Sequence, residues 1–248
     1  MKTAEEIKLM KGREKIAVLT CYDYFTAKIL DSIGMDIILV GDSLANVVLG
    51  YKTTRDITMN DMNIFTEAVA RGAKNSLIVG DMPYLSDRNK EEAVKNARIF
   101  IQSGANAVKV EGNKEEQIKA VIKDGIPVMA HIGLLPQTSK TFEMQGKDKK
   151  AADKLIDDAK ALESYGCFCI VLECVVPELA KKITESVKIP TIGIGSGKYC
   201  NGQVLVINDI LGLCDKSPGF AKKYADLGKE IKKAVENYRA DVKEDKYP

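Results

Sequence analysis

The sequence predicts an α/β protein folded as a (β/α)8 TIM barrel. Short apolar runs recur along the chain with the length of buried parallel strands, and amphipathic helical segments separate them. The 248 residues match the roughly 250 residues of such a barrel. Ionisable residues follow several of these runs, as expected at the carboxyl-terminal rim, where barrel active sites lie. Because no Pro/Gly/Ser-rich linker divides the chain, we expect a single domain over residues 1–248 with a short helical extension at the amino terminus.

Eight strands and the helices between them can be placed in order. The expected strands are Ile16–Thr20, Asp36–Val40, Ser76–Val79, Ala107–Val110, Pro127–Ala130, Cys169–Leu172, Thr191–Ile194 and Val204–Ile207. The expected helices are Tyr24–Ile33, a helix from Asn60 or Asp61 to Arg71, Asn89–Ser103, Lys114–Lys123, Lys149–Tyr165, Pro177–Ser186 and Ala221–Val242. Two connections, 46–59 and 133–146, are long enough to be functional lids.

Charge and composition exclude several classes of protein. The 37 basic and 35 acidic residues leave a net charge of +2, which argues against a nucleic-acid or membrane surface. No apolar run approaches the roughly 20 residues of a membrane span, and Met1–Arg13 lacks a signal-peptide core. The six cysteines include no Cys-x-x-Cys pair, which favours free thiols. We therefore expect a cytoplasmic protein.

Three carboxylates follow adjacent strands. Asp42, Asp81 and Glu111 stand at the ends of strands two, three and four. Each alone could cap the next helix. Together they would repel one another unless paired, and oxygen ligands with room for water and substrate suit Mg²⁺. The set therefore predicts a magnesium site.

Two further residues lie beside these acids. Lys109 precedes Glu111 by two positions, so both side chains point into the barrel. Lys109 either forms a buried ion pair with Glu111 or, as we favour, holds a substrate carboxylate near the cation. Ser43 either donates to the same anion or caps a helix or a turn.

The remaining candidates follow strands five, six and eight. His131, the single histidine, is either a core residue or a hydrogen-bond donor to substrate, and its place before a long loop favours the second. Glu173 ends an apolar strand, which suits it to accept a proton from carbon. It could instead be a salt-bridged acid of the rim. Asp209 either orients a rim residue or caps a helix, and the sequence leaves both open.

Read together, short segments along most of the chain resemble the ketopantoate hydroxymethyltransferase family. The segments are Thr20-Cys-Tyr-Asp23, Val40-Gly-Asp-Ser-Leu44, Gly80-Asp-Met-Pro83, Val108-Lys-Val-Glu-Gly112, His131-Ile-Gly-Leu134, Pro136-Gln137, Gln145-Gly146, Leu172-Glu-Cys-Val175, Gly193-Ile-Gly-Ser-Gly197 and Gly202-Gln-Val-Leu205. The resemblance implies a barrel of the phosphoenolpyruvate/pyruvate superfamily. It also implies a homo-oligomer, commonly a decamer built as a pentamer of dimers.

The resemblance also implies a reaction. A hydroxymethyl group passes from 5,10-methylenetetrahydrofolate to 3-methyl-2-oxobutanoate and forms 2-dehydropantoate through a Mg²⁺-stabilised enolate, in pantothenate and coenzyme A biosynthesis. The family's metal acids fall on Asp42 and Asp81, with Glu111 as a further ligand, directly or through water. Its other functional positions fall on Ser43, Asp81, Lys109 and Asp42 as substrate contacts and on Glu173 as proton acceptor.

The chain departs from the family pattern at a few positions. Residues 138–144, Thr-Ser-Lys-Thr-Phe-Glu-Met, form a shorter loop than usual, and Ala45 and Asn201 replace a glycine and an aspartate. These changes bear on folate binding more than on keto-acid binding. Two other hypotheses remain: a Mg²⁺-dependent 2-oxo-acid lyase or decarboxylase of the same superfamily, and a non-catalytic keto-acid sensor. The lyases typically carry a lid cysteine that is not evident here, and a sensor needs no proton acceptor.

Overall fold

The computed structural model describes residues 1–139 and 141–247. The chain forms two compact units, residues 1–204 and 205–248, and each is treated by itself. The expectation of one domain over 1–248 stays a prediction. Among the described residues, no helix combines the length and the apolar character that crossing a membrane requires.

Eight parallel strands close into a barrel in sequence order, which confirms the predicted fold. The strands are β1 (Ile16–Thr20), β2 (Ile37–Val40), β3 (Leu77–Asp81), β4 (Ala107–Glu111), β5 (Val128–Gly133), β6 (Cys169–Glu173), β7 (Thr191–Ile194) and β8 (Gly202–Leu205).

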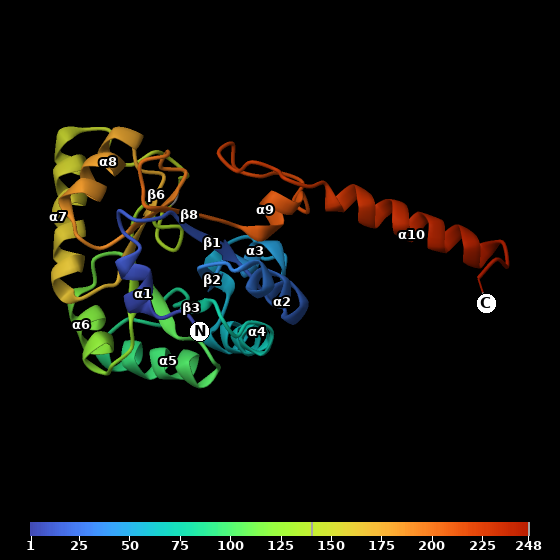
Figure 1. The fold of residues 1–248 in the computed structure, drawn as a ribbon, viewed down its shortest axis with the longest axis horizontal. Coiled ribbons are helices and arrows are strands. Elements are labelled where there is room, and N and C mark those ends of the chain that lie inside the picture. Colours follow the sequence, from blue (N-terminus) through green and yellow to red (C-terminus); the bar gives the residue numbers. More distant parts are fainter. Residues whose placement is uncertain (140, 248) are drawn as a thin grey trace. The chain divides into compact units, whose positions relative to one another are not determined.

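Helices connect the strands and surround them (Figure 1). The first unit contains α1 (Ala4–Leu9), α2 (Tyr24–Ile33), α3 (Leu44–Val47), the 3₁₀ helix η1 (Thr54–Asp56), α4 (Met59–Gly72), α5 (Lys90–Gln102), α6 (Glu115–Lys123), α7 (Lys149–Tyr165) and α8 (Pro177–Ser186). The connection predicted over residues 46–59 thus includes part of α3 and all of η1. Thr58, not Asn60 or Asp61, caps α4, because its side chain accepts a hydrogen bond from the Asp61 N–H.

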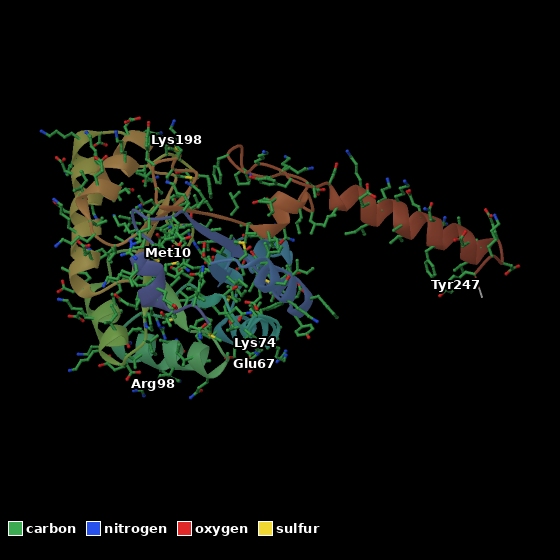
Figure 2. The ribbon with its side chains drawn as sticks, viewed as in Figure 1. Met10, Glu67, Lys74, Arg98, Lys198 and Tyr247 are labelled. Carbon is green, nitrogen blue, oxygen red and sulfur yellow. The ribbon has the colours of Figure 1, made fainter. Side chains whose placement is uncertain are left out.

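The barrel interior is filled by alternate residues of the strands. Ile16, Leu39 and Met129 belong to one buried cluster that also contains Ile7 and Met10 of the N-terminal segment. Figure 2 shows Met10 within the outline of the first unit, whereas Arg98 lies at its periphery. The N-terminal segment therefore packs against the amino-terminal end of the barrel core.

The same alternation carries polar side chains into the barrel at the other end. Val79 belongs to the interior cluster, so Asp81, two residues later on β3, points inward as well. Ala107 likewise sets the direction of Lys109 and Glu111 on β4. These strands are longer than predicted, and the acids are their last residues.

At the amino-terminal end of the barrel, two charged side chains contact main-chain groups. Asp31 of α2 accepts hydrogen bonds from the main-chain N–H groups of Lys74, Asn75 and Ser76 at 2.8–3.0 Å. Lys11 donates to three main-chain oxygens before β7, at 2.7–2.9 Å. These groups tie loops together.

The eighth strand differs from the prediction. It spans Gly202–Leu205, and residues 207–211 form the helix α9 (Ile207–Leu211). A side chain at Gly202 would lie 2.4 Å from the Ile16 main-chain oxygen, so β8 begins where only glycine permits that approach. Asp209 therefore lies within α9 and not at the end of a strand, so its predicted placement was wrong.

The second unit contains α9 and the longer helix α10 (Leu227–Lys243). The sequence predicted the start of the final helix at Ala221, six residues too early. No residue of α10 is buried. Ile231, Val235, Tyr238 and Val242 are exposed at spacings of three and four, so they form one apolar stripe along the helix.

Candidate active site

Six ionisable side chains predicted from the sequence lie at the carboxyl-terminal ends of β2 to β6, and none is more than 8% exposed. They are Asp42, Asp81, Lys109, Glu111, His131 and Glu173. The strand register places Asp81 beside Lys109 and Glu111 beside His131. Parallel pairing with inward-facing alternate residues therefore brings together groups that are up to 131 positions apart in the chain.

Lys109 and Asp81 form a buried ion pair. The Lys109 Nζ donates to both carboxylate oxygens of Asp81, at 2.7 and 2.8 Å. The partner is thus Asp81 and not Glu111, the partner considered from the sequence. Burial opposes the charge on the ammonium, but Asp81, Glu111 and Asp42 outweigh burial and raise the pKa of Lys109. The lysine therefore stays charged.

Asp42 adds a second carboxylate beside this pair. Its main-chain N–H donates to Asp81 Oδ2 at 3.2 Å, and its Oδ2 accepts a hydrogen bond from Gln137 Nε2 at 2.9 Å. Burial and the charge of Asp81 raise the pKa of Asp42 to about 8, and burial also raises the pKa of Asp81. One lysine does not compensate the acids gathered here, so the group favours binding of a further positive charge.

His131 lies between two glutamates. Its Nδ1 is 3.5 Å from Glu111 Oε1, and its Nε2 is 3.3 Å from Glu173 Oε2. Neither ring nitrogen makes an aligned hydrogen bond to a described residue. Burial and Lys109 lower the pKa of His131, but the two glutamates outweigh them and raise it to about 9. Burial raises the pKa of Glu111, and His131 and Lys109 more than reverse this, so that it is lowered overall.

The backbone around Glu173 is tightly held. Its main-chain oxygen accepts a hydrogen bond from the Leu134 N–H at 2.8 Å. Gly133 faces it with φ +100°, and a Cβ there would lie 2.3 Å from that oxygen. The next residue, Cys174, has φ +49°, an uncommon conformation for a side chain other than glycine. These constraints fix the point from which the Glu173 side chain enters the barrel.

Ser43 stands at the first position before α3, yet its side chain makes no capping hydrogen bond. Its Oγ instead lies 2.8 Å from the Tyr22 hydroxyl. Burial raises the pKa of Tyr22, so its phenol stays protonated and able to donate. The capping role considered for Ser43 was therefore wrong, and its hydroxyl lies at the rim beside Asp42.

Gln137 is the site residue that the sequence analysis missed. It is 2% exposed. Besides contacting Asp42, its side-chain amide donates to the Met82 main-chain oxygen at 2.9 Å, and its main-chain N–H donates to Glu111 Oε2 at 3.3 Å. The available signal was its place in the Pro136-Gln137 segment, directly after the strand that carries His131.

The carboxylates of Asp42, Asp81 and Glu111 are candidate metal ligands. Within residues 1–139 and 141–247, no three His, Cys, Asp or Glu side chains are already arranged around one cation position. Mg²⁺ needs fewer protein ligands, because it keeps water and is commonly bound by one or two carboxylates plus substrate oxygens. Asp42 and Asp81 supply two such carboxylates with raised pKa values. The donor set therefore fits Mg²⁺.

Solved structures of other proteins share this fold. The structure is similar to phosphoenolpyruvate phosphomutase from Streptomyces platensis subsp. rosaceus, with a TM-score of 0.66 at 14% identity over 98% of this chain and 88% of that one. It is also similar to 2,3-dimethylmalate lyase, a member of the PEP mutase/isocitrate lyase superfamily, with a TM-score of 0.64 at 15% identity over 98% and 88% of the two chains. At these identities the likeness concerns the fold alone.

Other proteins are far more similar to this chain in sequence than the proteins of these solved structures are. The chain is 51% identical over 246 residues to a 3-methyl-2-oxobutanoate hydroxymethyltransferase of Syntrophomonas wolfei, covering 96% of this chain and 89% of that protein. It is 52% identical over 251 residues to the protein of the same name from Thermotoga maritima, covering 98% and 93%. The family model for ketopantoate hydroxymethyltransferase matches residues 1–248. The chain therefore belongs to the ketopantoate hydroxymethyltransferase family and is a transferase.

Proposed function

We propose that the protein transfers a hydroxymethyl group from 5,10-methylenetetrahydrofolate to 3-methyl-2-oxobutanoate and forms 2-dehydropantoate, in pantothenate and coenzyme A biosynthesis. The names of relatives at 51–52% identity support this substrate. The observation that carries the proposal is the buried cluster itself. It combines a pair of acids suited to a cation with a separate carboxylate, Glu173, whose backbone is fixed at the end of β6.

Asp42 and Asp81 would hold Mg²⁺, with Glu111 as a further ligand through water. Glu111 is less suited to direct coordination, because its two oxygens already face His131 and the Gln137 N–H. When bound, Mg²⁺ would supply Lewis acidity that favours negative charge on the keto oxygen of the substrate.

Lys109 and Ser43 would orient the 2-oxo acid. Two N–H groups of the Lys109 ammonium point to Asp81, and its third would donate to the substrate carboxylate. Ser43, with its hydroxyl beside that of Tyr22, would donate to the same carboxylate. Both donors act inside a buried site, where their interactions with an anion are stronger than in water.

Glu173 would take the proton from C3 of the substrate. His131 lies 3.3 Å from Glu173 Oε2 and 3.5 Å from Glu111 Oε1, so it would hold the Glu173 side chain at the rim, and its N–H contact with the substrate would replace one of these two contacts. The C3–H electron pair then forms the enolate. Its C3 forms a bond to the methylene carbon of the folate as one of that carbon's two C–N bonds breaks and the freed nitrogen takes a proton. Water then supplies the hydroxyl group to the same carbon as the second C–N bond breaks, and the water proton passes to the second nitrogen, which releases tetrahydrofolate and the hydroxymethyl product.

The test is exchange of the C3 proton of 3-methyl-2-oxobutanoate in D₂O, followed by NMR with Mg²⁺ or with EDTA. We expect exchange that requires Mg²⁺ and the formation of 2-dehydropantoate after methylenetetrahydrofolate is added. Folded protein that exchanges no C3 proton under any of these conditions would refute the mechanism. Exchange without product would refute the transfer step alone.

We also propose a cytoplasmic homo-oligomer, a decamer built as a pentamer of dimers. All six cysteines are free, and five are buried, as suits a reducing compartment. The apolar stripe of α10, Ile231, Val235, Tyr238 and Val242, is exposed in the single chain, which supports its burial between subunits. Light scattering of the purified protein tests the assembly, and a monomer at micromolar concentration would refute it.

A further inference from the structure

The strongest unassigned feature is a side chain that joins two loops over the candidate site. Arg55 lies in η1, in the connection after β2, and its Nε donates to the Gln137 main-chain oxygen at 2.7 Å. Its Nη2 donates to the Ser139 main-chain oxygen at 3.2 Å, in the connection after β5. The guanidinium also lies 5.6 Å from the centre of the Tyr84 ring, after β3. One arginine in the connection after β2 thus contacts the connections that follow β3 and β5.

The position of Arg55 is itself fixed locally. Thr53 caps η1, because its hydroxyl accepts a hydrogen bond from the Arg55 N–H at 3.2 Å. Ile57, on the other side of η1, is 3% exposed and anchors the connection in the core. Arg55 is exposed, so its hydrogen bonds serve the loops rather than the barrel interior.

Gln137 connects this brace to the acids. Its amide holds Asp42 Oδ2, and its N–H faces Glu111 Oε2. A neutral donor fixes one oxygen of the Asp42 carboxylate without supplying charge, and the other oxygen would bind the proposed cation. An arginine in place of this amide would add positive charge where the proposed cation lies and would compete with it.

We propose that Gln137 is a positioning residue for Asp42 and that Arg55 holds Gln137 in place through its main-chain oxygen. The chain of contacts runs from Arg55 to Gln137 and from Gln137 to Asp42. This inference rests on the proposed function for the role of Asp42. It predicts that loss of the Arg55 guanidinium weakens Mg²⁺ binding without changing any group that touches substrate.

The test compares Arg55→Gln, Arg55→Lys and the control Arg88→Gln. Arg88 is a matched exposed arginine after β3 whose guanidinium contacts Glu92 at 2.9 Å and no group of the candidate site. Gln137→Leu is used only as a secondary variant. It leaves the buried Asp42 carboxylate without its hydrogen-bond donor, and this loss can prevent folding. Each protein is first shown to be folded at the temperature of measurement by its unfolding transition.

Two readouts are used. Hydrogen–deuterium exchange of the metal-free protein follows residues 134–146, where the Thr138 and Ser139 N–H groups both donate to Leu135 oxygen. Calorimetric titration with Mg²⁺ alone gives the dissociation constant. For Arg55→Gln we expect about tenfold faster amide exchange in this segment and a Mg²⁺ dissociation constant raised roughly 3- to 10-fold. Arg55→Lys should recover part of both, and Arg88→Gln should match the wild type.

The C3 exchange rate then separates positioning from general damage. At saturating Mg²⁺, Arg55→Gln should reach within about threefold of the wild-type rate, because Glu173 is untouched. Arg55→Gln with wild-type amide exchange and a Mg²⁺ dissociation constant within twofold of wild type would overturn the inference. Wild-type protein that neither binds Mg²⁺ nor exchanges the C3 proton would instead overturn the proposed function.

Discussion

At the amino-terminal end of the barrel Asp31 accepts hydrogen bonds from three main-chain N–H groups, whereas at the carboxyl-terminal end Asp42 accepts one from a neutral amide and faces another carboxylate. Burial raises the pKa of Asp31, but the N–H donors of residues 74–76 outweigh it and lower it to about 2. Asp42 has no comparable compensation, and its pKa rises to about 8. An ionised aspartate thus stabilises the fold at the amino-terminal end of the barrel and destabilises it at the carboxyl-terminal end.

A half-buried lysine, Lys11, and a buried lysine, Lys109, differ in the same way. Lys11 donates to three neutral main-chain oxygens and closes a loop, whereas Lys109 faces the carboxylates of Asp81, Asp42 and Glu111. Asp31 and Lys11 at the amino-terminal end are satisfied largely by the backbone and need no ligand. The polar groups at the other end are satisfied only in part, which is the condition under which a cation or a substrate adds stability.

The largest expected effect is on catalysis, which should depend on a carboxylate at the carboxyl-terminal end of the barrel and not on one at the amino-terminal end. Glu173→Gln removes the proposed proton acceptor and should lower C3 exchange and turnover on the order of 10³-fold while the 2-oxo acid still binds. Glu163→Gln is the matched control, because Glu163 Oε1 accepts only main-chain N–H groups before β7. Its turnover should stay within about twofold of wild type. Turnover retained by Glu173→Gln would reject Glu173 as the base.

The two lysines allow a comparison of stability. Lys109→Met leaves Asp81 in the barrel without its partner and should lower the unfolding free energy in EDTA by about 3–5 kcal/mol. Lys11→Met loses hydrogen bonds to neutral oxygens and should cost about 1–3 kcal/mol. Urea unfolding of both variants measures the difference. Equal losses would show that the ends do not differ in charge compensation.

Replacing Asp42 and replacing Asp31 should change the free energy of unfolding in opposite directions. Asp42→Asn keeps an oxygen that accepts from Gln137 but removes a crowded charge, so the metal-free protein should gain about 1–2 kcal/mol in unfolding free energy at pH 8. Asp31→Asn should lose a similar amount, since charged acceptors hold N–H groups more strongly. Asp42→Asn should also abolish stabilisation by Mg²⁺. A loss in metal-free stability for Asp42→Asn would contradict the comparison.

The sequence predicted most of the fold because the pattern of buried runs and helical segments is local. It also predicted the site acids, since residues two apart on a strand share a face and parallel strands bring their carboxyl ends together. The eighth strand was misplaced by two residues because Val206 and Ile207 continue the apolar run into α9. The decisive feature there is a contact between Gly202 and Ile16 across 186 positions.

Two of the missed contacts join loops. Arg55 and Gln137 are 82 positions apart, and Gln137 and Asp42 are 95 apart. Neither contact can be predicted from a periodic sequence pattern, because loop residues lack the regular alternation of side-chain direction that strands and helices have. The pairing of Lys109 with Asp81 was missed for another reason. The neighbour two residues away, Glu111, was the local choice, and only the register of β3 against β4 places Asp81 closer.

The smallest expected effect concerns pH and Asp31. Its folded pKa of about 2 lies below its usual value of 3.8, so its contribution to stability is present above about pH 4 and is lost as pH falls toward 2. The wild type should therefore exceed Asp31→Asn by about 1–2 kcal/mol at pH 6, and the difference should shrink between pH 4 and pH 2.5. Urea unfolding of both proteins across this range measures it. A difference that stays constant would mean that Asp31 stabilises the loop by shape rather than by its charge, and the contrast with Asp42 would then lie in packing.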